Sequence, residues 1–166
     1  MDEVPLAQIF QRAMVLQRSG IRDDAIKAYE EFLQVAELHN VDPSLYAEVY
    51  ANMGAIFAMQ GKDSDTKERK HEIRQKAKAS FQKAVEYRPG LGTAWVNLAL
   101  LLLAEGKDNS GYDAFAVEKV LKEARSCCER ALGMENEDKR SWQLANKLIG
   151  DIDVMMKQNN VQKPFQ

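Results

Sequence analysis

Histidine and cysteine, the side chains that most often act as acid–base catalysts, nucleophiles or zinc ligands, are few in this chain and poorly spaced for chemistry. His39 and His71 are isolated from each other, and Cys127 and Cys128 are neighbours, which is not the spacing of a zinc or redox pair. We find no serine elbow, phosphate-binding loop or metal-ligand pair in the sequence. We therefore predict that the protein is not an enzyme and has no catalytic residue, no metal and no cofactor.

Charge and cysteine content bear on partners and compartment. The 166 residues carry a formal charge of -2 and a pI near 5.8, which gives no global reason to bind nucleic acid or an acidic membrane. The N-terminus lacks the regions of a secretion signal, and the apolar run LALLLLA at 98–104 is shorter than the roughly 20 residues of a membrane-spanning helix. We expect a soluble protein of the cytoplasm or another reducing compartment, such as an organelle matrix or stroma.

Positive charge is concentrated in one stretch. Between Lys67 and Lys78 there are six Lys or Arg residues and two acids, Glu68 and Glu72. Helical spacing places five basic side chains on one side, which we call the basic arm: Lys67, Lys70, His71, Arg74 and Lys78. The basic arm is either a solvated face with internal ion pairs or a docking site for an acidic protein surface. RNA is less favoured, because no aromatic residues interleave for base stacking.

The elements that would position these side chains are helices. Only four prolines and nine glycines interrupt the sequence, and the apolar residues between them recur at spacings of three and four rather than two. No segment alternates between polar and apolar residues as a half-buried strand does. We predict an all-α protein that buries its core without disulfides or metals.

One order of small and large residues recurs three times. The copies are Tyr50-x2-Met53-Gly54-x2-Phe57 with Gly61, Ala77-x3-Phe81-x2-Ala84 and Pro89; Trp95-x2-Leu98-Ala99-x2-Leu102 with Gly106 and Ala124-x3-Cys128-x2-Ala131; and, weaker, Ile9-x2-Arg12-Ala13-x2-Leu16 with Gly20 and Ala25-x3-Tyr29-x2-Phe32. They resemble the tetratricopeptide repeat (TPR), W-x2-L-G-x2-Y, A-x3-F and P. Its small residues let helices A and B of a repeat approach closely, and its large ones fill the gaps between stacked pairs.

The resemblance implies a TPR-like right-handed helical-hairpin solenoid of about seven helices. Its single domain spans 1–166, with repeat 1 at about 6–43, repeat 2 at about 44–89, repeat 3 at about 92–136, a capping helix at about 138–158 and a tail at 159–166. The repeat anchors Ile9, Tyr50, Trp95 and Trp142 lie 41, 45 and 47 residues apart, whereas the regular period is about 34. Residues have therefore been inserted.

The insertions in repeats 2 and 3 follow the helix A glycines, Gly61 and Gly106. Each starts with cap-forming residues, Asp63 or Ser64 in one and Asn109, Ser110 or Asp113 in the other, so we expect helix B of both repeats to be extended at its N-terminal end. Charged residues replace the packed stripe of the first extension, which is expected to stand clear of the core.

The second extension keeps an apolar stripe at Val117 and Leu121. That stripe is expected to touch either the first extension or a partner. Farther along the same helix, Cys128 stands at a packed position and is expected to be buried, whereas Cys127, one step round the helix, is expected to be partly exposed.

TPR stacks present helix A side chains on a concave surface, so the resemblance implies a groove on this chain. At least ten of the fifteen corresponding residues are apolar, which suits an apolar helix or extended segment of a partner. The chain could instead fill its own groove with the capping helix, or with Val161 and Phe165 of the tail. The predicted partner groove comprises Phe10, Met14, Ala51, Asn52, Ala55, Met59, Val96, Asn97, Leu100 and Leu103.

Co-chaperones of the TPR family hold a peptide carboxylate with two Lys, two Asn and one Arg. The corresponding positions here are Phe10, Met14, Asn52, Thr93 and Asn97, of which only Asn52 matches. We predict a protein–protein interaction adaptor or assembly scaffold with a protein partner, and not a carboxylate-clamp co-chaperone. The alternative is a constitutive structural subunit of a large complex, comparable to photosystem-assembly or other organellar complex factors.

Overall fold

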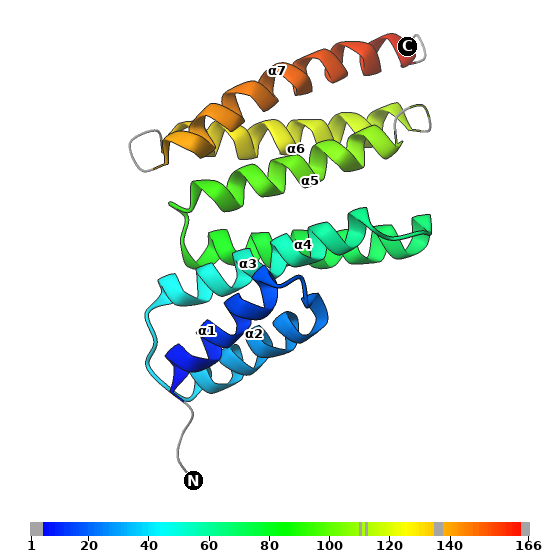
Figure 1. The fold of residues 1–166 in the computed structure, drawn as a ribbon. Helices are drawn as coiled ribbons and strands as arrows, with labels where there is room; N and C mark the ends of the chain where they lie inside the picture. Colours follow the sequence, from blue (N-terminus) through cyan, green and yellow to red (C-terminus); the bar gives the residue numbers. More distant parts are fainter. Residues whose placement is uncertain (1–4, 110, 112, 135–137, 164–166) are drawn as a thin grey trace. The chain divides into compact units, whose positions relative to one another are not determined.

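The computed structural model describes residues 5–109, 111, 113–134 and 138–163. Within these residues the chain forms seven α-helices and no strand (Figure 1), so the predicted all-α class is confirmed. The helices are α1 (Leu6–Arg18), α2 (Arg22–Glu37), α3 (Pro43–Lys62), α4 (Lys67–Tyr87), α5 (Gly92–Asn109), α6 (Ala114–Leu132) and α7 (Lys139–Gln162).

The helices belong to two compact units, Met1–Arg88 and Pro89–Gln166. In unit 1, α1 pairs with α2, α3 pairs with α4, and α2 contacts α3. In unit 2, α5 pairs with α6, and α7 packs on both of them. Each unit is therefore built from helical hairpins, and α7 covers the last of these as the predicted capping helix would.

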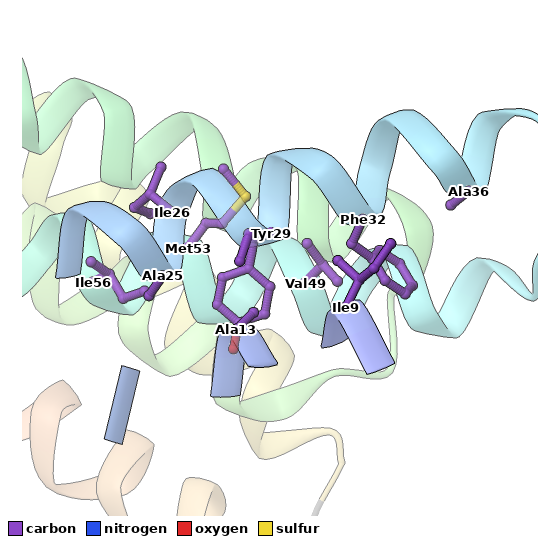
Figure 2. Close-up of a cluster of buried hydrophobic side chains, with 11 residues drawn as sticks. Ile9, Ala13, Ala25, Ile26, Tyr29, Phe32, Ala36, Val49, Met53 and Ile56 are labelled. Carbon is purple, nitrogen blue, oxygen red and sulfur yellow. The ribbon is translucent and has the colours of Figure 1, made fainter. Parts of the chain in front are cut away.

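The core of unit 1 joins its first three helices. Ile9 and Ala13 on α1 meet Tyr29 and Phe32 on α2, together with Val49, Met53 and Ile56 on α3, in one buried cluster (Figure 2). Full burial of a large apolar side chain contributes about 1.5–3 kcal/mol, so this cluster is a main source of stability for the unit.

Gly54 allows the close approach of α3 and α4 that the repeat pattern predicts. A Cβ at this position would lie only 2.8 Å from Cδ1 of Phe81, whose ring is buried against the glycine. Real Cβ atoms do not approach a ring so closely, because protein interiors are packed at van der Waals distances. The small residue at this repeat position is therefore required by the packing of the hairpin.

Short polar side chains cap the N-terminal ends of α3, α4 and α6. Asp42 caps α3 by accepting a hydrogen bond from the Ser44 N–H at 2.8 Å, with Pro43 at the first helical position. Asp113, one of three predicted candidates, caps α6. The cap of α4 is Thr66, which accepts from the Arg69 N–H at 3.3 Å. The prediction of Asp63 or Ser64 was therefore wrong, because α3 continues to Lys62 and the turn starts later.

The inserted residues of repeats 2 and 3 lengthen mainly the second helix of each of these two hairpins. α4 and α6 extend at their N-terminal ends as predicted, but α3 and α5 also continue past Gly61 and Gly106. A Cβ on Gly61 would lie 3.6 Å from Cγ2 of Ile73, which is half-buried. The α4 extension therefore packs along α3, but none of its residues from 67 to 76 is buried, so it stands clear of the core as predicted.

The apolar stripe of the α6 extension is covered within unit 2. Val117 and Leu121 are buried, and a Cβ on Gly106 of α5 would lie 3.1 Å from Cδ2 of Leu121. On the α7 side, Nδ2 of Asn159 donates a hydrogen bond to the Ala114 carbonyl at 2.7 Å. The stripe thus meets α5 and α7, and neither of the two predicted neighbours is needed to explain it.

The end of the chain and the two cysteines depart from expectation in detail. α7 continues to Gln162 rather than ending near residue 158, and Val161 is 86% exposed, so it does not tuck into a groove. Phe165 lies outside the described residues. Cys128 is buried as predicted, but Cys127 is only 4% exposed, so the prediction of partial exposure was wrong.

Candidate functional site

The candidate surfaces lie on α1 and α3 in unit 1 and, separately, on α5 in unit 2; these helices occupy the helix A positions of the repeat pattern. On α3, residues at alternating spacings of three and four form one stripe: Leu45, Glu48, Asn52, Ala55 and Met59. Met59 is 52% exposed at one end of this α3 stripe and Leu45 is 39% exposed at the other. Between them Asn52 and Ala55 are partly exposed, as is Ala51 beside the stripe.

Leu45 is a surface residue that the repeat pattern did not select. It lies one turn before Glu48, outside the repeat positions that line TPR grooves. Extending the periodicity of Asn52, Ala55 and Met59 backwards by one turn would have found it. The structure therefore adds Leu45 to the surface predicted on α3.

On α1, the predicted groove residues are divided between surface and core. Phe10 and Met14 are half-buried. The Phe10 ring packs edge to face on Phe32, with centroids 5.7 Å apart, and on Tyr29 at 6.1 Å. Phe10 thus helps to hold α1 on α2, and only part of its ring is accessible to a partner.

A hydrogen-bonded chain ties together the three helices that form this part of unit 1. Nδ2 of Asn52 on α3 donates to the Tyr29 hydroxyl at 3.1 Å. That hydroxyl donates to Oε1 of Gln17 on α1 at 2.6 Å. Burial of Tyr29 raises the pKa of its phenol, so the hydroxyl remains a neutral donor. One N–H of the Asn52 amide is therefore committed to internal structure.

On α5, the predicted groove residues fall on two sides of the helix. Leu100 is 39% exposed and Asn97 is partly exposed, but Val96 and Leu103 are buried at 2% and 4%. Val96 and Leu103 each point about 100° around the helix axis away from the accessible residue that follows, Asn97 or Ala104, because an α-helix has 3.6 residues per turn. The accessible face of α5 is therefore Thr93, Asn97, Leu100 and Ala104, which is less apolar than predicted.

The basic arm lies on α4, with its members at different depths. Lys67 and His71 are exposed, whereas Lys70, Arg74 and Lys78 are partly buried. Both Arg74 and Lys78 already have polar or electrostatic interactions. Docking of an acidic surface on this arm stays a prediction.

Titratable side chains do not gather into a metal-binding group anywhere in the described part of the chain. A stack of tyrosines does occur in unit 1, where the Tyr87 ring lies 5.1 Å from Tyr46 and 5.8 Å from Tyr50, and Lys83 lies over Tyr50 at 5.9 Å. Burial is the main reason that the pKa of both Tyr46 and Tyr50 is raised, and the neighbouring Tyr87 raises it further. The three tyrosine rings therefore pack together at the repeat anchor Tyr50.

Comparisons with known proteins bear on the fold. No protein-family model and no curated protein matches the chain. Among solved structures, the chain is similar to one described as the TPR2B-domain:pHsp70-complex of yeast Sti1, at 18% sequence identity and a TM-score of 0.53. The match covers 95% of this chain and 98% of the other. The likeness extends over nearly all of both chains, and the predicted TPR-like all-α solenoid fold is confirmed.

The likeness defines the class of the fold and not a ligand. None of the helices in the described residues is both long and apolar enough to cross a membrane. The candidate binding surfaces are the helix A faces, the basic arm and the grooves between helices.

Proposed function

We propose that this chain is a protein–protein interaction adaptor or assembly scaffold. Its partner is an apolar helix or an apolar extended segment that lies along the outward faces of the helix A positions. In unit 1 the binding face is the α3 stripe with the accessible parts of Phe10 and Met14. In unit 2 it is the face of α5 around Leu100. The TPR-like fold supports this proposal, because stacked helical hairpins present extended binding surfaces.

The exposure of Met59 carries the proposal. Its side chain is 52% exposed and lies one turn from the small residue Ala55, so a partner backbone can approach closely beside it. Methionine is flexible and polarisable, which suits it to binding apolar partners of irregular shape. Leu45 and Leu100 add branched apolar side chains, each 39% exposed.

The chemistry of the face favours an apolar ligand over a peptide carboxylate. The similar solved structure is, by its description, a complex with pHsp70. In this chain Phe10, Met14 and Thr93 stand where a carboxylate clamp requires basic or amide side chains. Asn52, which matches the clamp, already donates to Tyr29. We therefore propose that binding depends on apolar contact rather than on a terminal carboxylate.

Site-specific photo-crosslinking tests the proposal. Benzoylphenylalanine placed at Met59, and separately at Leu100, is expected to crosslink one protein in native extract. The matched control is the same group at Leu38, which is 82% exposed at the C-terminal end of α2 and outside the proposed face. If the proteins crosslinked at Met59 and Leu100 were the same as those crosslinked at Leu38, the assigned face would be refuted.

A further inference from the structure

A groove runs between α2 and the N-terminal extension of α4 on unit 1, apart from the face of α3 proposed above. It has a volume of about 1140 Å³, more than the about 300–1,000 Å³ of typical small-molecule pockets. Ile26 on α2, Phe57 on α3 and Ile73 on α4 contribute apolar side chains to it. We call it the α2–α4 groove.

The groove follows from the insertion in repeat 2. Because of the inserted residues, α4 begins at Lys67, well before Ala77, the first residue of its repeat pattern. The first turns of α4 therefore form a second wall opposite α2. One end of the groove is fixed by two contacts of α2, one with the α3–α4 connection and one with the last turn of α3. Arg22 pairs with Asp63, and Nε2 of Gln60 donates to Oδ1 of Asp23 at 2.8 Å. The walls are therefore positioned before any ligand binds.

Negative charge dominates the lining. Six carboxylates face four cationic side chains, a net charge of -2. Arg22 is paired with Asp63, and Lys76 with Glu72 at 3.7 Å. Among the described residues no ion pair involves Glu30 on α2, Asp65 in the connection or Glu68 on α4. Within the described residues, carboxylates outside these ion pairs thus lie on α2, on α4 and in the α3–α4 connection, and one lining cation, Arg69, is also outside them.

The two sides of the α4 extension differ in charge. The groove side carries two acids and two bases, Glu68 and Glu72 with Arg69 and Lys76, beside the apolar Ile73. The basic arm occupies other positions on the helix and does not line the groove. The net negative charge of the groove therefore comes from Asp63 and Asp65 in the α3–α4 connection, and it suits a ligand with positive charge around an apolar side chain.

We propose that the α2–α4 groove binds a short polypeptide segment of another protein in which basic side chains flank an apolar one. The apolar side chain lies over Ile26, Phe57 and Ile73. The basic ones lie near Glu30, Asp65 and Glu68. This second surface would let the chain hold two partners at once, one on the helix A faces and one here.

Synthetic peptides test this proposal on the full chain. The probe is a fluorescein-labelled decapeptide with four lysines around two central leucines, measured by fluorescence anisotropy at low salt. Its matched versions replace the leucines by serine, or the lysines by glutamate. We expect saturable binding of the first peptide below about 1 mM, equivalent to about -4 kcal/mol, and at least about ten-fold weaker binding of both replacements.

Charge reversal on the protein locates the binding. Glu30→Lys with Glu68→Lys is expected to weaken binding of the lysine–leucine peptide about ten-fold and to reduce its salt dependence. The control is Glu86→Lys with Glu37→Lys, two exposed positions that neither line the groove nor belong to the α3 stripe. Met59→Glu on the α3 stripe is expected to leave peptide binding unchanged. Failure of the groove proposal can therefore be distinguished from failure of the proposed function. Equal loss in groove and control variants, or no saturable binding, would overturn the proposal.

Discussion

Asn52 on α3 donates a hydrogen bond to the Tyr29 hydroxyl on α2 at 3.1 Å, and through that hydroxyl α3 is joined to Gln17 of α1. Tyr29 is completely buried in the core of unit 1 (Figure 2), and its hydroxyl makes the hydrogen bonds to the two amides. Asn52 and Ala55 belong to the proposed binding face, so the same contacts that hold the three helices also set the shape of that face.

Tyr29→Phe tests this connection. Removing the hydroxyl breaks two hydrogen bonds, so it is expected to lower the free energy of unfolding by about 1–3 kcal/mol, at about 0.5–1.5 kcal/mol for each bond. Urea unfolding followed by circular dichroism measures it. A double-mutant cycle with Asn52→Ala should give a coupling energy of at least about 0.5 kcal/mol. Tyr46→Phe, which also keeps its ring, is the control, and a loss as large there would show that the effect comes from removing any phenol hydroxyl and not from these hydrogen bonds.

Gly54→Ala tests the approach of α3 and α4. The added Cβ would lie 2.8 Å from the buried Phe81 ring, so we expect a loss of about 1–3 kcal/mol in stability by overpacking. Gly150→Ala on α7 is the matched control, because a Cβ there meets no atom within 4 Å. That change should stabilise by up to about 1 kcal/mol through helix propensity. Equal effects of the two substitutions would contradict the packing at Gly54.

Glu118 is expected to make unit 2 acid-sensitive. Hydrogen bonds from Lys122 and Lys163 lower the pKa of its carboxyl from 4.5 to about 2. A carboxyl whose pKa is lower in the folded state stabilises the fold above its unfolded pKa and loses that contribution as pH falls. The unfolding free energy of the wild type relative to Glu118→Gln should therefore shrink as pH falls from about 5 to 2.

Lys163→Met separates the two lysines in this prediction. It removes the cation that joins the end of α7 to α6 and leaves Lys122 in place. The pH-dependent difference should become smaller but persist. A difference between wild type and Glu118→Gln that does not change with pH would mean that the carboxyl is not held by these lysines in solution.

The packing inside each hairpin could be predicted from sequence, because the repeat pattern encodes it directly. Gly54 against Phe81, and buried Ala13, Ala99 and Ala124, stand where small residues are required. Helix ends were predicted less well. The cap of α4 is Thr66 rather than the predicted Asp63 or Ser64, and α7 continues to Gln162 rather than ending near residue 158, because the repeat pattern fixes neither position.

Accessibility on the binding face could be predicted only in part. Repeat positions place Val96 and Leu103 toward the groove, but both are buried, and Leu100 between them is exposed. Neighbouring residues on a helix differ in direction by about 100°, so a small rotation decides which are covered. That rotation is set by contacts between helices, which the sequence pattern of one helix does not contain.

The burial of Leu103 also changes how the face should be tested. A charged residue at this buried position would unfold the protein rather than report on binding, so substitutions belong at Met59 and Leu100. Met59→Glu places a charge on the α3 stripe without burying it. Leu38→Glu places the same charge on an exposed apolar residue elsewhere in unit 1.

The most direct test is the affinity of the protein that crosslinks at Met59, measured by isothermal titration calorimetry with these variants. We predict that Met59→Glu raises the Kd at least about ten-fold, equivalent to about 1.4 kcal/mol, while Leu38→Glu leaves it within about two-fold. Thermal melting should show both variants folded. Binding of Met59→Glu as tight as that of the wild type would contradict the proposal that the α3 stripe holds the partner.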